Sequence, residues 1–356
     1  MKIALDVQGS DKGIPVVVDG ARIVAAEGIE VVLVGPSDEI ASAGPLPSNV
    51  TVVNATEVVS NHDDPGTAVR ARKDSSIVVG AKLVATGEAD ALVSAGPTGA
   101  ALAASLFNMK RIKGVKRPAI AVILPDGRGG RSLLLDAGAN VDVPAELLVQ
   151  FATLGAQFSI RVLGVQNPRV GLLSIGEEDG KGNERVVHAG QLLSDPENSH
   201  YFNYLGNIEG RDITNGNADV IVTDGFTGNV ALKAIEGAAR ATMMAIADAI
   251  RSNAIAKIGG LLAKRSLLKV RHEVDPNTTG GALLLGLRGV SVIAHGSSNA
   301  EGIAAAIRLA ARSVEGDVTG HMASAIAELN AHAASTAAVT VGAVETESSN
   351  GALNDA

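Results

Sequence analysis

The chain has 356 residues, of which 46% are hydrophobic, 19% charged and only 2% aromatic, and its formal net charge is −8. These values fit a large aliphatic core, whereas the negative charge and the scarcity of aromatic rings argue against a protein that binds nucleic acid. The chain has no cysteine, which excludes disulfides, cysteine-bound metals and a thiolate nucleophile.

Apolar runs of strand length alternate with longer helical patterns along most of the chain. We expect strands at 2–7, 30–34, 89–94, 119–124, 132–135, 169–175, 220–223 and 290–294. We expect helices at 15–24, 66–85, 100–110, 144–163, 230–250, 300–313 and 317–333. This alternation predicts an α/β fold with a mainly parallel sheet and helices on both faces.

The ends of the chain set the expected domain limits. The N-terminus lacks the apolar core of a signal peptide, and no run reaches the length of a membrane-spanning helix, so we expect any membrane contact to be peripheral. From Ser335 onward the chain is rich in Ala, Thr, Ser, Gly and Asn. We therefore expect one α/β domain over 1–334 and a disordered tail over 335–356.

Five polar loops follow buried strands, at 94–99, 136–142, 176–184, 224–229 and 295–299. The carboxyl ends of parallel strands share one edge of a sheet, so these loops are expected to converge on one cleft. Their polar members are Ser94, Thr98, Asp136, Asn140, Lys181, Asn183, Asp224, Thr227, Asn229, His295 and Ser297. This set suits an oxyanionic ligand. The sequence contains no zinc-site spacing, no Walker lysine motif and no Gly-x-Ser-x-Gly elbow.

The loop at 176–184 follows an apolar strand, contains three glycines and precedes a helical pattern. Backbone N–H groups at a helix start favour an anion, and Lys181 would add a positive charge. An ordinary connecting loop with solvated charges is the alternative interpretation of this stretch.

The segment 254–271 has five basic residues and no acidic one. A basic amphipathic helix of this kind is typical of proteins that bind an anionic membrane surface. The residues expected at the membrane are Leu261, Leu262, Leu267, Leu268, Lys264 and Arg265. The alternative is a surface helix that packs its leucines inward.

Several of these motifs together resemble the PlsX family, the acyl-ACP:phosphate acyltransferases of bacterial phospholipid synthesis. The matching segments, in the order of the family, are Ser94–Ala100, Arg111–Ala119, Gly138–Asp142, Gly182–Glu184, Gly206–Asp212, Asp224–Asn229 and Ala294–Ser298. The resemblance covers about residues 1–330. The sequence departs from the family at Gln8-Gly-Ser-Asp11, where the family has Met-Gly-Gly-Asp, and at Thr278–Gly281, which lacks the family's usual tyrosine before the paired glycines. It also has Pro97 in place of an asparagine, which removes an amide and a backbone donor.

The resemblance implies a fold like that of the isocitrate dehydrogenases and phosphotransacetylases, and a homodimer. It also implies that inorganic phosphate attacks the thioester of acyl-ACP without a cofactor or a metal. A downstream glycerol-3-phosphate acyltransferase would consume the acyl phosphate. The expected location is the cytoplasm, with peripheral association at the inner face of the membrane.

Within this chemistry, positioning and charge neutralisation should dominate, because phosphate is already a nucleophile at neutral pH. We expect Lys181 to stabilise phosphate or the oxyanion, and Asn183, Asn229 and Asn140 to donate hydrogen bonds. His295 could protonate the leaving thiolate or only hydrogen-bond in the cleft, with Asp224 as an orienting partner. Ser94, Thr98, Thr227 and Ser297 are expected to contact substrate, whereas Asp142 is expected to cap a helix near Pro144.

Three other functions share some of these sequence features. The nearest is a phosphate acetyl- or butyryltransferase that uses a CoA thioester. A decarboxylating dehydrogenase is disfavoured, since no aspartate cluster for a metal and no dinucleotide glycine motif stands out. A non-catalytic membrane-surface adaptor is motivated by 254–271 alone.

Overall fold

The computed structural model describes residues 1–273, 275 and 278–351, with side chains described for 1–270, 275 and 278–335. The strands are β1 Lys2–Asp6, β2 Glu30–Gly35, β3 Val50–Asn54, β4 Ala91–Ser94, β5 Ala119–Pro125, β6 Arg131–Leu135, β7 Arg169–Leu173, β8 Asn203–Ile208, β9 Val220–Val222, β10 Ala282–Leu285 and β11 Val290–Ile293. The α-helices are α1 Ile14–Ala25, α2 Ser37–Ser42, α3 Pro65–Ala71, α4 Ser76–Thr86, α5 Thr98–Met109, α6 Ala145–Phe158, α7 Glu184–Leu193, α8 Pro196–Ser199, α9 Gly225–Arg251, α10 Ala254–Glu273, α11 Ala300–Glu315 and α12 Val318–Gly351. A π-helical turn (η1, Ser159–Leu163) extends α6, and a 3-10 turn (η2, Gly210–Thr214) follows β8.

All eleven strands form one sheet in the order β3-β2-β1-β4-β11-β10-β5-β6-β9-β7-β8. The five strands from β3 to β11 are mutually parallel, and so are the four from β6 to β8. Between them, β10 is antiparallel to both neighbours, and β5 is antiparallel to β6. The predicted α/β fold with a mainly parallel sheet is therefore confirmed, and the sheet consists of two parallel halves that run in opposite directions.

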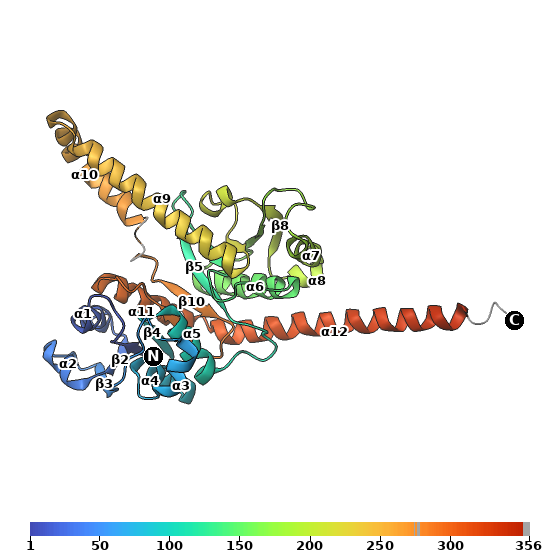
Figure 1. The fold of residues 1–356 in the computed structure, drawn as a ribbon, viewed down its shortest axis with the longest axis horizontal. Helices are drawn as coiled ribbons and strands as arrows, with labels where there is room; N and C mark the ends of the chain where they lie inside the picture. The colour runs from blue at the N-terminus through green and yellow to red at the C-terminus, as the bar shows by residue number, and fades with distance from the viewer. Residues whose placement is uncertain (274, 276–277, 352–356) are drawn as a thin grey trace.

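Helices cover both faces of this sheet, which gives three layers (Figure 1). Alternation along each strand explains the layers, because successive side chains point to opposite faces. Ile3 and Leu5 pack into a core with α1, α6, α7 and α11, whereas Ala4 packs into a second core with α3, α4, α5 and α9.

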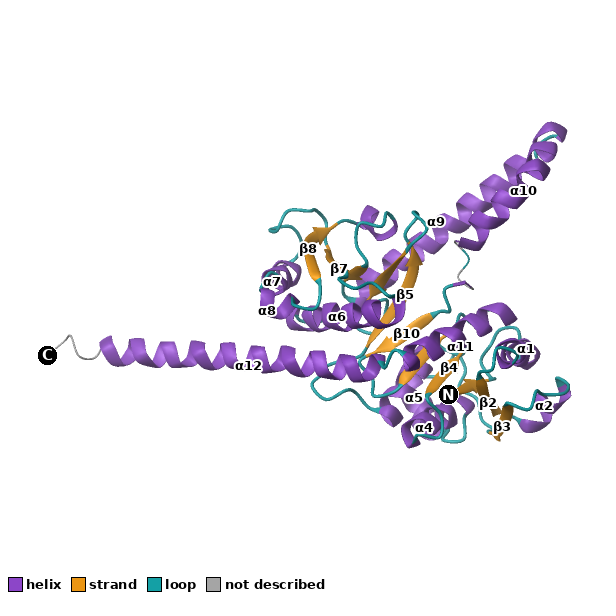
Figure 2. Ribbon diagram, turned by 180° about the vertical axis from the view of Figure 1, so that it is seen from behind, coloured by secondary structure: helices purple, strands orange, loops and turns teal. Residues whose placement is uncertain are grey.

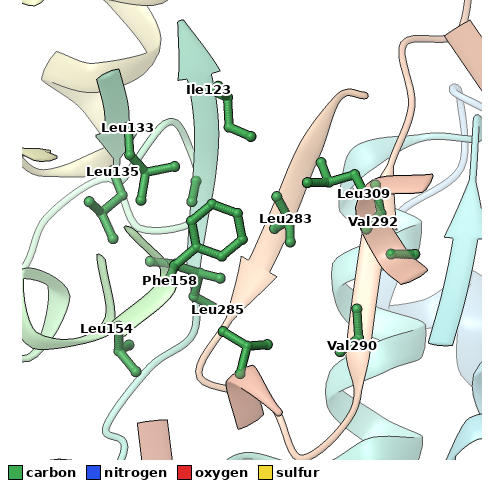
Figure 3. Close-up of a cluster of buried hydrophobic side chains, with 14 of the residues drawn as sticks. Ile123, Leu133, Leu135, Leu154, Phe158, Leu283, Leu285, Val290, Val292 and Leu309 are labelled. Carbon is green, nitrogen blue, oxygen red and sulfur yellow. The ribbon is translucent and has the colours of Figure 1, made fainter. Parts of the chain in front are cut away.

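The two halves of the sheet share a continuous apolar core (Figure 3). Leu133 and Leu135 of β6, Leu283 of β10 and Val292 of β11 belong to the same buried cluster, together with Phe158 at the end of α6. Burying this much aliphatic and aromatic surface is strongly favourable, at roughly 1.5–3 kcal/mol for each large side chain. This shared core therefore fixes the position of one half of the sheet relative to the other.

Two helical features extend away from the body (Figures 1 and 2). One is the antiparallel pair formed by α9 and α10, and the other is the long C-terminal helix α12. None of the helices in the described part of the chain has the length and apolar character that crossing a bilayer requires.

Several elements differ from those expected. The helix predicted at 66–85 is divided into α3 and α4, since Arg72 leaves the helical region (φ −96°, ψ 76°) and its guanidinium pairs with Asp63. Three strands were not predicted from the sequence, namely β3, β8 and β10, which are short or carry little apolar alternation. Residues 335–351 continue α12 as a helix where a disordered tail was expected. Only three of these 17 residues are alanine and twelve are Val, Thr, Ser, Gly or Asn, so helix propensity does not account for the continuation. The last five residues of that expected tail, 352–356, lie outside the described residues.

Candidate active site

A cavity of about 270 Å³ lies at the carboxyl ends of β1, β4 and β11. It is lined by Gly9, Asp11, Asn61, Ala95, Gly96, Pro97, Thr98, Lys233, Ala294, His295 and Gly296. Lys233 comes from α9, which begins in the other half of the sheet. Both halves therefore contribute to this cavity.

The N-terminus of α5 opens on this cavity, because Pro97 and Thr98 both line it. Pro97 occupies the N-cap position, and no side chain caps the helix. The N–H groups of the first turn therefore remain available to an anion, and the helix dipole favours negative charge there. Gly9 has φ +90°, and a Cβ added to it would come within 2.6 Å of Gly96 Cα, so only glycine allows the β1 loop to approach this closely.

A buried carboxyl lies directly behind the cavity. The Ser94 hydroxyl donates to Asp6 Oδ2 (2.7 Å) and accepts from the Gly96 N–H (3.0 Å), and Gln8 donates its backbone N–H to Asp6 Oδ1 (3.0 Å). Burial raises the pKa of Asp6 to about 6, against the hydrogen bonds from Ser76, Ser94 and Gln8, which lower it. Ser94, expected to contact substrate, is fully buried and instead ties the β1 loop to the β4 loop.

His295 lies at the cavity wall with Ser297 beside it. Ser297 donates its backbone N–H to His295 Nδ1 (3.2 Å), and the Ser297 hydroxyl is 2.8 Å from the same nitrogen. Nδ1 is therefore an acceptor, so the neutral ring carries its proton on Nε2. The structure thus joins two of the predicted residues, with Ser297 holding the histidine in one tautomer.

In the other half of the sheet, Asp136 organises the loop after β6. Its Oδ1 accepts from the N–H groups of Ile120 (2.9 Å) and Ala139 (3.0 Å), and its Oδ2 accepts from the N–H (2.7 Å) and the side-chain amide (2.8 Å) of Asn140. Burial raises the pKa of Asp136, against these hydrogen bonds. Asn140 also donates to the Pro118 carbonyl (2.8 Å), so its amide hydrogens hold the loop rather than point to a ligand.

Asp224 joins the loop after β9 to α7. It caps α9 by accepting from the Thr227 N–H (2.7 Å), and it accepts from Arg185 Nη2 (3.0 Å). Arg185 also pairs with Asp142. The expectation that Asp142 caps a helix is wrong, since α6 has no side-chain cap and the Asp142 carboxylate binds this guanidinium instead.

The glycine-rich loop after β7 leads into α7, the helix whose Arg185 contacts Asp224. Asn183 caps α7 by accepting from the Val186 N–H (3.0 Å), and Arg185 follows two residues after this cap. Lys181 is exposed, and its backbone carbonyl accepts from the Ser174 hydroxyl (2.9 Å). Within the described part of the chain, no contact joins the Lys181 ammonium to the cavity that His295 lines.

The first turns of α9 connect the two groups of residues. Asn229 lies against Gly138, whose added Cβ would be 3.6 Å from the asparagine side chain. Four residues further along the helix is Lys233, and side chains at this spacing lie on the same face. Thr227 lies in the first turn of α9, between Asp224 and Asn229, and is exposed. The five polar loops are thus brought together as two clusters bridged by one face of α9.

Sequence reasoning missed three residues of this arrangement: Asp6, Arg185 and Lys233. Asp6 is the last residue of β1, and Asp136 and Asp224 likewise come at or just after the ends of β6 and β9. An aspartate at the end of a buried strand could therefore have indicated Asp6. Helical spacing from Asn229 would have indicated Lys233. Among the described residues, no group of three or more His, Cys, Asp or Glu side chains could hold a metal ion.

Comparisons with known proteins agree with this architecture. The family model described as "Fatty acid synthesis protein" matches residues 1–321. The phosphate acyltransferase of Desulfitobacterium hafniense (strain Y51) is 47% identical over 320 residues, which cover 88% of this chain and 94% of the relative. The phosphate acyltransferase of Geotalea daltonii is 44% identical over 333 residues, covering 92% and 95%.

Solved structures show the same fold at low identity. The EutD phosphotransacetylase of Staphylococcus aureus matches with a TM-score of 0.58 at 18% identity, and a phosphotransacetylase from Streptococcus pyogenes with 0.59 at 19%. Each match covers 88% of this chain and 94% of the solved chain. On the family match and the identity to curated relatives, the chain belongs to the phosphate acyltransferase family, a family of acyltransferase enzymes.

Proposed function

We propose that the protein catalyses attack of inorganic phosphate on the thioester carbonyl of long-chain acyl-ACP, for phospholipid synthesis. A phosphate oxygen forms the new bond to the acyl carbon, the carbon–sulfur bond breaks, and the products are acyl phosphate and the ACP thiol. The observation that carries this proposal is the cavity in which an uncapped helix N-terminus, Lys233 and His295 meet. Such a site offers hydrogen-bond donors and positive charge to an anionic substrate.

Phosphate is placed at the N-terminus of α5, where Thr98 begins the helix. Free backbone N–H groups and the helix dipole bind the anion, and the Lys233 ammonium adds charge from the opposite wall. Lys233 pairs with Glu236 (2.8 Å) in this structure, and its side chain is 57% exposed. It is therefore free to exchange that carboxylate for phosphate, since an exposed ion pair is worth little.

His295 is assigned to the leaving group. Because Ser297 occupies Nδ1, the proton of the neutral imidazole is on Nε2, where it can stabilise the carbonyl oxygen and then pass to the departing thiolate. Asn229 is the candidate donor to the carbonyl oxygen from the α9 side. Asp224 and Arg185 position the start of α9, and with it both Asn229 and Lys233.

Lys181 and Asn183 are further catalytic candidates because of the position of their loop. The loop follows β7 and leads into α7, whose Arg185 contacts Asp224. In this proposal, the Lys181 ammonium neutralises charge that develops on the substrate when it lies between the two clusters.

We also propose peripheral membrane binding through α10 of the α9–α10 pair. Leu261, Leu262 and Leu268 of α10 are 70%, 82% and 50% exposed, an arrangement that water disfavours. Leu267 is partly covered, and Lys264 and Arg265 are exposed beside the leucines. Basic residues near an anionic surface contribute about 1 kcal/mol each. Release of an amphipathic acyl phosphate at the bilayer would deliver it to a membrane acyltransferase that uses glycerol 3-phosphate.

A homodimer is proposed from the uncovered side of α9. Phe226, Val230 and Met244 are 62%, 53% and 61% exposed along this helix. A second copy could bury these side chains by packing the same helix pair against itself, as a two-fold interface requires.

The alternative is transfer from a short acyl-CoA, which the shared fold with phosphotransacetylases favours. The purified protein is assayed with phosphate and either palmitoyl-ACP, palmitoyl-CoA or acetyl-CoA, and the free thiol is measured. We expect phosphate-dependent thiol release to be fastest with palmitoyl-ACP. Turnover with acetyl-CoA alone would contradict the proposal.

A further inference from the structure

The loop between α5 and β5 concentrates positive charge on an acidic protein. Eight residues carry five cations and no carboxylate: Lys110, Arg111, Lys113, Lys116 and Arg117. All five side chains are exposed, and none of them forms an ion pair with another described residue. We call these five residues the basic loop.

The backbone of the basic loop is held rigidly from below. The carbonyl of Gly114 accepts from Gln150 Nε2 (3.0 Å) and from Asn330 Nδ2 (3.3 Å), and Lys116 donates its N–H to Gln150 Oε1 (3.0 Å). Gln150 is 2% exposed, so the loop backbone is tied to a residue of the protein interior. Buried, satisfied polar contacts of this kind fix a conformation.

The apolar residues of the loop point inward and its lysines are exposed, whereas the Arg111 guanidinium donates to the Lys116 carbonyl of the same loop. Ile112 and Val115 are 4% and 5% exposed, and they anchor the loop against the body. A hollow of about 410 Å³ lies between the loop and Leu106 of α5, and the neighbouring Phe107 is 39% exposed. The surface thus combines exposed cations that form no ion pair among the described residues with a mostly polar hollow, on a backbone held by Gln150 and Asn330.

We propose that the basic loop is the docking surface for the acidic carrier protein that delivers the acyl thioester. This inference rests on the proposed function and names where its protein substrate binds. Opposite charges steer such encounters and fix their orientation. α5 connects the loop to the cavity, because Thr98 at its start lines the cavity and Lys110 follows its end, about 18 Å away at 1.5 Å per residue. A carrier delivers its thioester on a long flexible arm, so docking at this distance still allows transfer.

A protein is favoured over a lipid surface by the arrangement of the molecule. The α9–α10 pair extends away from the body, whereas α5, which leads to the basic loop, lies in the body beside α4 (Figures 1 and 2). When α10 lies on a bilayer, the basic loop is left on the body for another partner. The hollow beside Leu106 also suits protruding side chains better than a planar layer of headgroups.

The test uses the full-length protein and the charge-reversed variant Lys113→Glu/Lys116→Glu. Binding of holo carrier protein without an acyl group is measured by calorimetry at low salt, together with KM for palmitoyl-ACP and for phosphate. We expect carrier affinity to fall roughly tenfold or more and KM for palmitoyl-ACP to rise in parallel, with kcat and KM for phosphate unchanged. Raising the salt concentration should weaken wild-type binding and have little effect on the variant.

The matched control is Lys73→Glu/Arg128→Glu, which makes the same change of charge at two exposed positions outside the loop. It should bind the carrier within about twofold of wild type. If the glutamates unfold the loop, Lys113→Gln/Lys116→Gln gives the same comparison with less repulsion. Unchanged carrier binding in a folded variant overturns the inference, as does loss of anionic-vesicle binding with carrier binding intact. Wild-type protein that binds carrier but transfers no acyl group would instead refute the proposed function.

Discussion

Replacement of Asp6 by asparagine tests how the buried carboxyl behind the cavity is held. Asp6 is 2% exposed, and burial raises its pKa from 3.8 to about 6. The folded protein therefore binds this proton more tightly than the unfolded chain does. The resulting stabilisation is complete below the unfolded pKa and is lost as the pH rises through 6. A shift of about two pKa units corresponds to about 3 kcal/mol between these limits, and about 1.4 kcal/mol of this falls between pH 5 and pH 8.

The asparagine has nearly the same shape and carries no charge at any of these pH values. Its oxygen can accept from the Gln8 N–H and its amide can face the Ser94 hydroxyl, so the loop contacts survive. We therefore expect wild type to lose about 1.4 kcal/mol of unfolding free energy relative to Asp6→Asn between pH 5 and pH 8. Urea unfolding followed by circular dichroism at both pH values measures this gap, with the exposed Asp38→Asn as control. A gap that is the same at both pH values would refute the reasoning.

The remaining predictions concern turnover and membrane binding. Lys233→Ala should raise KM for phosphate by roughly tenfold or more in steady-state assays, with Lys233→Arg retaining most of the affinity, and equal KM values would remove this lysine from the phosphate site. His295→Gln should lower kcat by about 10²-fold with unchanged circular dichroism, whereas wild-type kcat would rule out proton transfer from this ring. Lys181→Ala should lower turnover by on the order of 10²-fold while the fold persists, and near wild-type kinetics would return it to a solvated loop residue. Leu261→Glu with Leu268→Glu should abolish cosedimentation with anionic liposomes but leave activity on acyl-ACP intact, and an unfolded double variant would place these leucines in the core.

The layers of the fold were predictable because the aliphatic strands are continuous. Leu133 to Leu135 is buried on both faces, and such a run indicates an interior strand whatever its neighbours. β8 was not predictable in the same way, because Asn203, Gly206 and Asn207 interrupt it and its register shifts against β7. Its place in the sheet is decided by pairing with β7, a contact distant in sequence.

Within the site, the sequence indicated which loops matter but not how their side chains are used. Asn140 and Ser94 have the right chemistry for substrate contact, yet both turn inward to an aspartate, at Asp136 and Asp6 respectively. Lys233 lies in a helix rather than in a polar loop, so only its helical spacing from Asn229 could have indicated it. Whether a polar residue faces ligand or backbone depends on long-range packing, which one-dimensional spacing does not encode.

Direct attack of phosphate on the thioester is the central claim, and isotope transfer tests it most directly. Purified protein is incubated with palmitoyl-ACP and ¹⁸O-labelled phosphate, and the products are analysed by mass spectrometry. The account predicts palmitoyl phosphate that carries every labelled oxygen of the phosphate, with one free ACP thiol formed for each molecule. Free palmitate without label, or an acyl group attached to the protein before phosphate is added, would contradict it.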